Sequence, residues 1–85
     1  MKIFVGNLTP STTSEQILEL FSGFGRVTSA EVVKDQHSGE SRGFGFVEMP
    51  AKAEARAASG ALDLEQLNGR AMTVNEARDG RGGRY

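Results

Sequence analysis

The chain has 85 residues, of which 38% are hydrophobic and 25% are charged, and its formal net charge is -1. This length suits one domain with one core, and the near-neutral charge argues against a strongly basic protein that binds phosphates regardless of sequence. Because cysteine is absent, disulfides, thiolate metal sites and cysteine nucleophiles are excluded.

Residues 2–6 alternate polar and apolar side chains around β-branched and aromatic residues. This pattern predicts a strand with Ile3 and Val5 on one face and Phe4 on the other. The apolar run is too short for a signal-peptide core or a membrane span. We therefore expect neither secretion nor membrane insertion.

A helix is expected to begin after Thr13. Thr13 and Gln16 have the spacing of a capping box, in which each side chain bonds the backbone N–H of the other. The apolar residues that follow recur at spacings of three and four: Ile17, Leu20, Phe21 and Phe24. This helix should therefore pack on a sheet through one apolar stripe.

Two further strands are expected over residues 27–34 and 42–49, joined by the polar turn 35–40. A turn of this kind between two strands predicts a hairpin. His37, the only histidine, lies in the turn with no cluster of partners. We expect it to be a solvated turn residue rather than a metal ligand or a base.

The last third of the chain predicts a second helix and a last strand. Pro50 suits the first turn of a helix over residues 51–62. The face of this helix that we expect to pack closely is rich in alanine: Ala53, Ala57, Ala58, Ala61 and Leu62. A turn at residues 68–69 precedes a strand over residues 71–77. Residues 78–85 are rich in Gly and Arg and should form a flexible basic tail.

The resulting βαββαβ order predicts an α+β fold, a ferredoxin-like sandwich in which two helices back a four-stranded antiparallel sheet. The first and third strands should lie in the middle of the sheet. By alternation, the face without helices carries these residues of the two central strands: Phe4, Arg42, Phe44, Phe46 and Glu48. Three exposed phenylalanines predict a binding partner. Gly43 and Gly45 alternate with them, and we expect these glycines to let a helix approach the sheet closely.

Two motifs lie on the predicted central strands. Residues 42–49, RGFGFVEM, match the pattern K/R-G-F/Y-G/A-F-V-x-F/Y at every constrained position except the last. Residues 3–8, IFVGNL, look like the companion motif of the same family. Over residues 1–77 the sequence thus resembles the RNA-recognition motif family. Its short form with an Arg/Gly tail is similar to small bacterial, cyanobacterial and glycine-rich RNA-binding members.

The resemblance implies that the chain binds single-stranded RNA, and it leaves single-stranded DNA open as a ligand. Phe4 and Phe44 would stack on two successive bases, Phe46 would contact the sugars between them, and Arg42 would pair with a phosphate. The remaining expected RNA contacts are Lys2, Asn75 and Arg78. No cofactor or metal is expected, and we expect a cytoplasmic monomer.

Two other functions are compatible with parts of this sequence. The aromatic residues could instead bind a protein partner, as in protein-binding relatives of this fold, and Glu31, Glu48 and Glu76 near the same surface favour that alternative. Small hydrolases of the acylphosphatase type share the βαββαβ order. Such an enzyme needs an arginine in the loop after the first strand, whereas residues 7–11 contain no cation. Catalysis is therefore not expected.

Overall fold

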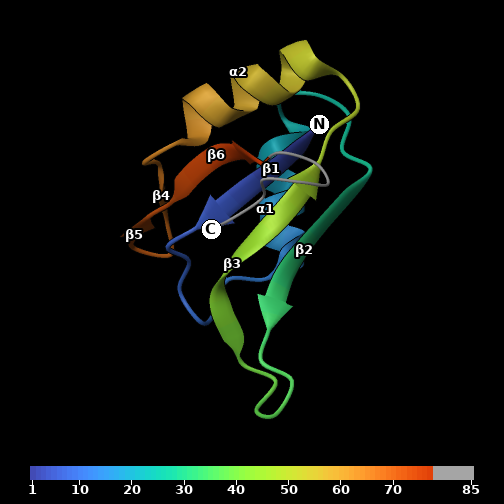
Figure 1. Cartoon of the computed structure of the whole chain (residues 1–85). Helices are drawn as coiled ribbons and strands as arrows, with labels where there is room; N and C mark the ends of the chain where they lie inside the picture. Colours follow the sequence, from blue (N-terminus) through green and yellow to red (C-terminus); the bar gives the residue numbers. More distant parts are fainter. Residues whose placement is uncertain (78–85) are drawn as a thin grey trace.

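The structure is a computed structural model that describes residues 1–77. Its elements are β1 (Lys2–Gly6), α1 (Ser14–Ser22), β2 (Ser29–Lys34), β3 (Ser41–Glu48), α2 (Lys52–Leu62), β4 (Gln66–Leu67), β5 (Arg70–Ala71) and β6 (Thr73–Ala77). The main sheet has the strand order β2-β3-β1-β6, and each strand is antiparallel to its neighbours. Figure 1 shows β1 and β3 in the middle of the sheet. The predicted ferredoxin-like α+β fold is confirmed.

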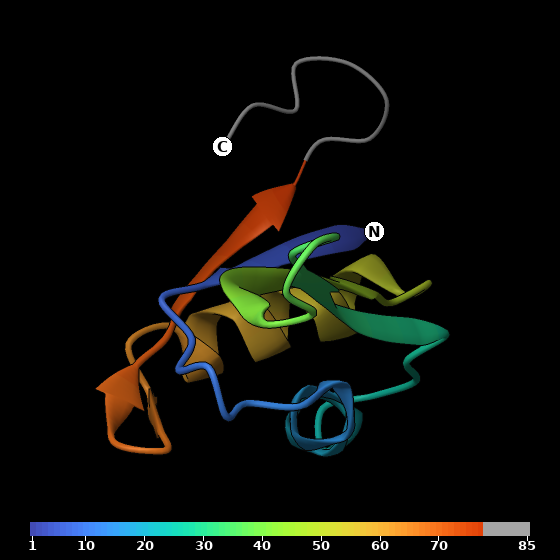
Figure 2. The same cartoon turned by 90° about the horizontal axis from the view of Figure 1, so that it is seen from below.

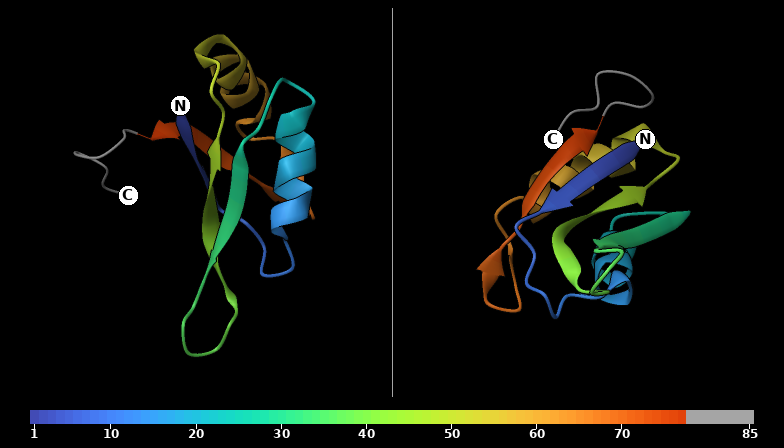
Figure 3. Two further views of the ribbon diagram at one scale, coloured as in Figure 1. Left: turned by 90° about the vertical axis from the view of Figure 1, so that its right-hand side faces the viewer. Right: turned by 60° about the horizontal axis from the view of Figure 1, so that its bottom comes forward.

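Both helices lie on one side of the sheet, as Figures 2 and 3 show from two directions. The core fills the space between these layers. Its buried side chains come from the sheet and from both helices: Ile3, Val5, Val32, Val47, Met72, Val74, Ile17, Phe21 and Leu62. Burial of this apolar surface is the main force that holds the helices to the sheet. Neither helix within residues 1–77 is long and apolar enough to cross a membrane.

The start of α1 follows the capping box predicted from the sequence. The Gln16 N–H donates to the Thr13 hydroxyl oxygen at 3.2 Å, and the Gln16 side-chain oxygen accepts from the Thr13 N–H at 3.1 Å. The next hydroxyl, on Ser14, accepts a hydrogen bond from the Val32 N–H at 3.0 Å. The first turn of α1 is therefore fixed both to its own backbone and to the edge strand β2.

The second helix, α2, packs through a different face from the one predicted. Its buried residues recur at spacings of three and four: Ala55, Ala58, Ser59 and Leu62. Three alanines of the predicted face are exposed: Ala53, Ala57 and Ala61. The helix begins at Lys52, so Pro50 lies before the N-cap residue Ala51 rather than in the first turn. Alanines occur all round this helix, and their pattern does not distinguish the buried stripe from the exposed one.

A short hairpin, β4 and β5, lies between α2 and the last strand. Asn68 and Gly69 at its turn have φ angles of 56° and 84°, which a two-residue hairpin turn requires. The Asn68 amide donates to the Thr12 hydroxyl at 3.1 Å and to the Gln16 side-chain oxygen at 3.2 Å. The sequence predicted the turn but not the hairpin. Consequently the last strand begins at Thr73 rather than at residue 71.

The two glycines of β3 have roles other than the predicted one. A β-carbon on Gly45 would collide with the backbone of β2 at Glu31 and Val32. The close approach at Gly45 is therefore made by the neighbouring strand, not by a helix. Gly43 has a φ of 85° and lies where the pairing of β2 and β3 is irregular. It allows a backbone conformation that other residues rarely adopt.

Candidate nucleic-acid interface

Three phenylalanines lie together on the sheet face opposite the helices, and we call Phe4, Phe44 and Phe46 the aromatic face. Phe4 in β1 is the direct cross-strand partner of Phe46 in β3. Phe44 follows at the next position of β3 that points the same way. All three side chains are half-buried. Ile3, Val5 and Val47 alternate with them along the strands and fill the core on the opposite face of the sheet. The predicted alternation therefore places the three phenylalanines on this face.

The three rings contact one another in the geometry that aromatic pairs prefer. The ring centroids of Phe4 and Phe44 lie 5.9 Å apart with an interplanar angle of 31°. Phe46 stands edge-on to both, with its centroid 5.9 Å from that of Phe4 and 6.1 Å from that of Phe44. Each ring is thus braced by the other two. Together they offer apolar surface on which planar groups can stack.

Gly6 makes room for the Phe4 ring, a role that the sequence did not predict. A β-carbon at Gly6 would lie 2.7 Å from Cε2 and 2.9 Å from Cζ of Phe4. Gly6 is the next residue of β1 on the same face, so the ring lies over it. The signal in the sequence is a glycine two positions after an aromatic residue in a strand.

Lys2 places a positive charge beside the aromatic face. Its Nζ lies 5.0 Å from the centroid of the Phe46 ring, a distance at which a cation is attracted to the ring face. Lys2 is also the cross-strand partner of Glu48. The predicted contact residue Lys2 is therefore beside Phe46, within reach of a ligand stacked there.

Arg42 lies at the far end of β3, beyond the irregular backbone at Gly43. Its side chain is exposed, and its positive charge helps to lower the pKa of Asp35. The larger causes of that lowered pKa are the N–H groups of His37 and Ser38, which donate to the Asp35 carboxylate at 2.7 Å and 3.2 Å. The structure thus places Arg42 near the β2–β3 turn.

The predicted residues near the C-terminal end of the domain differ in their positions. Asn75 is exposed and is the cross-strand partner of Phe4, so it extends the row of residues across the aromatic face. Glu76 pairs with Ile3 and forms an ion pair with Arg56 of α2, with Nε and Oε2 3.7 Å apart. Glu76 therefore lies on the helix side, and its expected position near the aromatic face is wrong. Arg78 and the predicted tail, 78–85, lie outside the described residues.

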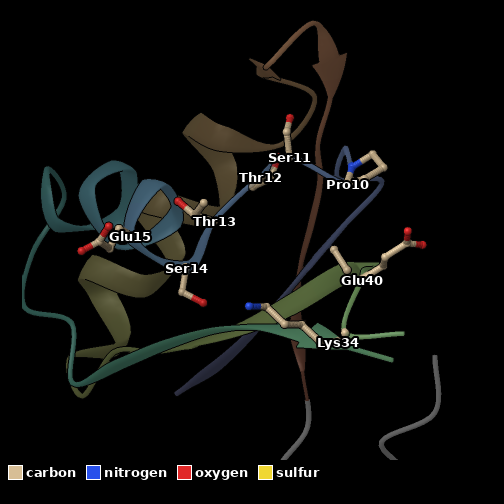
Figure 4. A pocket seen from close by; sticks show the side chains of 10 residues that line it. Pro10, Ser11, Thr12, Thr13, Ser14, Glu15, Lys34 and Glu40 are labelled. Atoms are coloured by element: carbon tan, nitrogen blue, oxygen red, sulfur yellow. The ribbon is translucent and has the colours of Figure 1, made fainter. Parts of the chain in front are cut away.

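A groove of about 730 Å³ lies away from the aromatic face, between the start of α1 and the β2–β3 turn. Figure 4 shows Lys34 pointing toward Ser14 there, while the Glu40 carboxylate points away. A smaller crevice of about 250 Å³ lies beside Phe46. Because stacking needs a flat surface rather than a cavity, the aromatic face is the better candidate interface.

The described residues show no evident metal-binding site. Among residues 1–77, no three His, Cys, Asp or Glu side chains are grouped so that they could hold a metal ion. What this surface offers instead is aromatic rings, one nearby ammonium group and polar side chains at the sheet edge. This chemistry suits a ligand with flat bases and a charged backbone.

Comparison with known proteins adds independent evidence. The sequence pattern of a family described as "RNA recognition motif" matches residues 3–73. Glycine-rich RNA-binding protein 1 of Mycosarcoma maydis is 44% identical over 99% of this chain and 50% of its own length. The chain therefore spans about half of that relative.

Solved structures are similar over most of the chain. The crystal structure of RNA-binding protein PG1 has a TM-score of 0.88 at 44% identity, and the match covers 91% of this chain and 93% of that one. The structure of the Rna15 RRM with bound RNA (GU) has a TM-score of 0.81 at 27% identity, with 92% and 83% covered.

Proposed function

The chain belongs to the RNA recognition motif family, and on this premise we propose that it binds single-stranded RNA on its aromatic face without catalysing a reaction. The observation that carries this proposal is the group of three mutually braced rings on the two central strands. A relative named as an RNA-binding protein and a similar structure with bound RNA support it.

Each residue of the interface has a proposed role. Two successive bases stack on Phe4 and Phe44, each contributing roughly 1–3 kcal/mol, and Phe46 contacts the sugars between them. Arg42 pairs with a phosphate, since its guanidinium offers both charge and a fork of donors. The other proposed contacts flank the rings or follow the last strand: Lys2, Asn75 and Arg78.

The biological setting is also a proposal. A protein that holds single-stranded RNA by stacking suits post-transcriptional regulation or RNA chaperoning. We place it in the cytoplasm, because a chain without cysteine needs no oxidising compartment. We also propose that it acts as a monomer. Residues 1–77 would be the binding domain, and the Gly- and Arg-rich residues 78–85 follow it in the sequence.

A fluorescence-anisotropy titration tests RNA binding. A labelled single-stranded RNA of mixed sequence would be titrated with the wild type, Phe4→Ala and Phe44→Ala, after circular dichroism has shown that each variant folds. We expect each change to weaken binding roughly fivefold to more than a hundredfold, the equivalent of one lost stacking contact.

Leu18→Ala is the matched control for these variants. Leu18 is an exposed apolar residue of α1, on the helix side of the sheet, so its removal should leave RNA affinity unchanged. If the wild type fails to bind RNA, or if the two phenylalanine variants bind as tightly as Leu18→Ala, the proposed function is wrong.

A further inference from the structure

The crevice beside Phe46 is lined by residues of three adjacent strands, β2, β3 and β1. Six residues line it: Lys2, Ser29, Glu31, Phe46, Val47 and Glu48. Glu31 is the cross-strand partner of Phe46, and Ser29 and Lys2 are the partners of Glu48 on either side of β3. The crevice therefore continues the aromatic face toward the edge strand β2, with Phe46 as the shared residue.

The charged groups around this crevice are of both signs. The Glu48 carboxylate accepts from the Met1 ammonium at 3.1 Å. The Glu31 carboxylate is exposed and has no hydrogen bond or ion pair with any of residues 1–77. The Lys2 ammonium lies over the Phe46 ring. A free acceptor and a cation thus stand on different sides of one aromatic ring.

The four RNA bases differ in how well they fit this arrangement. A carboxylate only accepts hydrogen bonds, so it favours a base edge with adjacent donors. Guanine has two such donors, N1–H and the N2 amino group, and its O6 and N7 atoms accept from a cation. Adenine and cytosine place a ring acceptor beside their amino group, and uracil flanks its one donor with two carbonyl oxygens. The carboxylate repels these acceptors.

We propose that the crevice beside Phe46 is a guanine site, in which Glu31 accepts from N1–H and the N2 amino group while Lys2 donates to O6 or N7. This inference rests on the proposed RNA binding and adds base preference to it. Ser29 and the Glu48 side chain close the crevice on the side away from the other two rings. A base placed there would extend the strand of RNA that stacks on Phe4 and Phe44.

The test compares three short oligouridines that carry guanosine, inosine or adenosine at the centre. Inosine differs from guanosine only by the missing N2 amino group. Dissociation constants would be measured by fluorescence anisotropy for the wild type and for Glu31→Gln. Glu31 is exposed and unpaired among the described residues, so its substitution should not disturb the fold.

We expect the inosine oligomer to bind the wild type with intermediate affinity, because inosine keeps N1–H and O6. The guanosine oligomer should bind about fivefold to 150-fold more tightly than the adenosine oligomer, the range for one good bidentate contact to a base. Glu31→Gln should reduce this ratio to near one. Glu19→Gln is the matched control, because it removes the same charge from an exposed position on α1. It should retain the full ratio.

Each other outcome overturns the inference in a recognisable way. Equal wild-type affinity for the three oligomers removes the guanine site and leaves the proposed RNA binding intact. A guanosine preference that survives Glu31→Gln moves base recognition away from this crevice. Absence of binding to all three oligomers overturns the proposed function together with the inference.

Discussion

Gly45 lies directly opposite Val32 across β3 and β2, so close that a β-carbon on Gly45 would stand 3.0 Å from the Val32 α-carbon. The colliding atoms belong to backbone, which cannot rotate away. Gly45→Ala should therefore lower the free energy of unfolding by roughly 1–3 kcal/mol, as overpacking of a dense site does. Urea unfolding followed by circular dichroism would measure the change.

Gly60→Ala is the counterpart of that substitution. Gly60 is an exposed residue of α2, and a β-carbon there meets no atom of the described chain within 4 Å. Alanine should raise the free energy of unfolding by about 0.5–1 kcal/mol, since glycine disfavours the helix. If Gly45→Ala and Gly60→Ala changed the free energy of unfolding equally, crowding at Gly45 would not be the cause of the effect of Gly45→Ala.

The Ser59 hydroxyl is buried against the sheet and has no hydrogen-bond partner among residues 1–77. Ser59→Ala should raise the free energy of unfolding by about 1 kcal/mol, because it removes a desolvated polar group without leaving a cavity. Ser14→Ala provides the contrast. It breaks the bond from the Val32 N–H and should lower the free energy of unfolding by about 1 kcal/mol.

The carboxyl group of Asp35 should titrate below its ordinary pKa of 3.8. Because the folded-state pKa is lowered, the ionised Asp35 carboxylate stabilises the fold fully above its ordinary pKa. This stabilisation is lost as the pH falls through the folded-state pKa. A carboxyl-detected NMR titration measures the shift directly. Arg42→Gln should leave most of it in place, because the N–H groups of His37 and Ser38 are the larger causes. An ordinary pKa in the wild type would contradict the turn geometry.

Salt should weaken RNA binding only slightly. The proposed cationic contacts are Lys2, Arg42 and Arg78, so one to three phosphates are neutralised. The slope of log affinity against log salt should then be about -0.7 to -2.1. Anisotropy titrations at several salt concentrations give this slope. A much steeper one would mean that charge rather than stacking dominates.

Duplex RNA should bind at least roughly tenfold more weakly than the same strand alone, since its bases are already stacked on one another. Competition of unlabelled duplex and single strand against one labelled RNA would show the difference. A single-stranded DNA of the same sequence belongs in this experiment, because stacking on phenylalanine does not require the 2′-hydroxyl. Equal competition by the duplex would rule out stacking on the aromatic face.

The sequence predicted the elements whose patterns are strong. Alternation in β1 and β3 placed the phenylalanines opposite the core, and the spacing of Thr13 and Gln16 located the start of α1. Both signals are local, and both agree with the tertiary packing of the fold. The strand order followed from the βαββαβ sequence and from the handedness of its crossovers.

The elements predicted less well lack such a pattern. In α2, alanines on several sides conceal the stripe that includes Ser59, and strands of two residues are too short for alternation to show β4 and β5. Glu76 was misplaced although strict alternation from Val74 puts it on the helix side. The crevice beside Phe46 depends on cross-strand neighbours, which sequence spacing alone does not reveal.

Both outer strands of the sheet have a backbone N–H bonded by a side chain from a helix end. Ser14 accepts from Val32 in β2, and Asp63 accepts from Val74 in β6 at 2.9 Å. An edge N–H that is already bonded cannot pair with a strand of another molecule. At these two points the domain is therefore protected against edge-to-edge aggregation, while its aromatic surface stays available for a ligand.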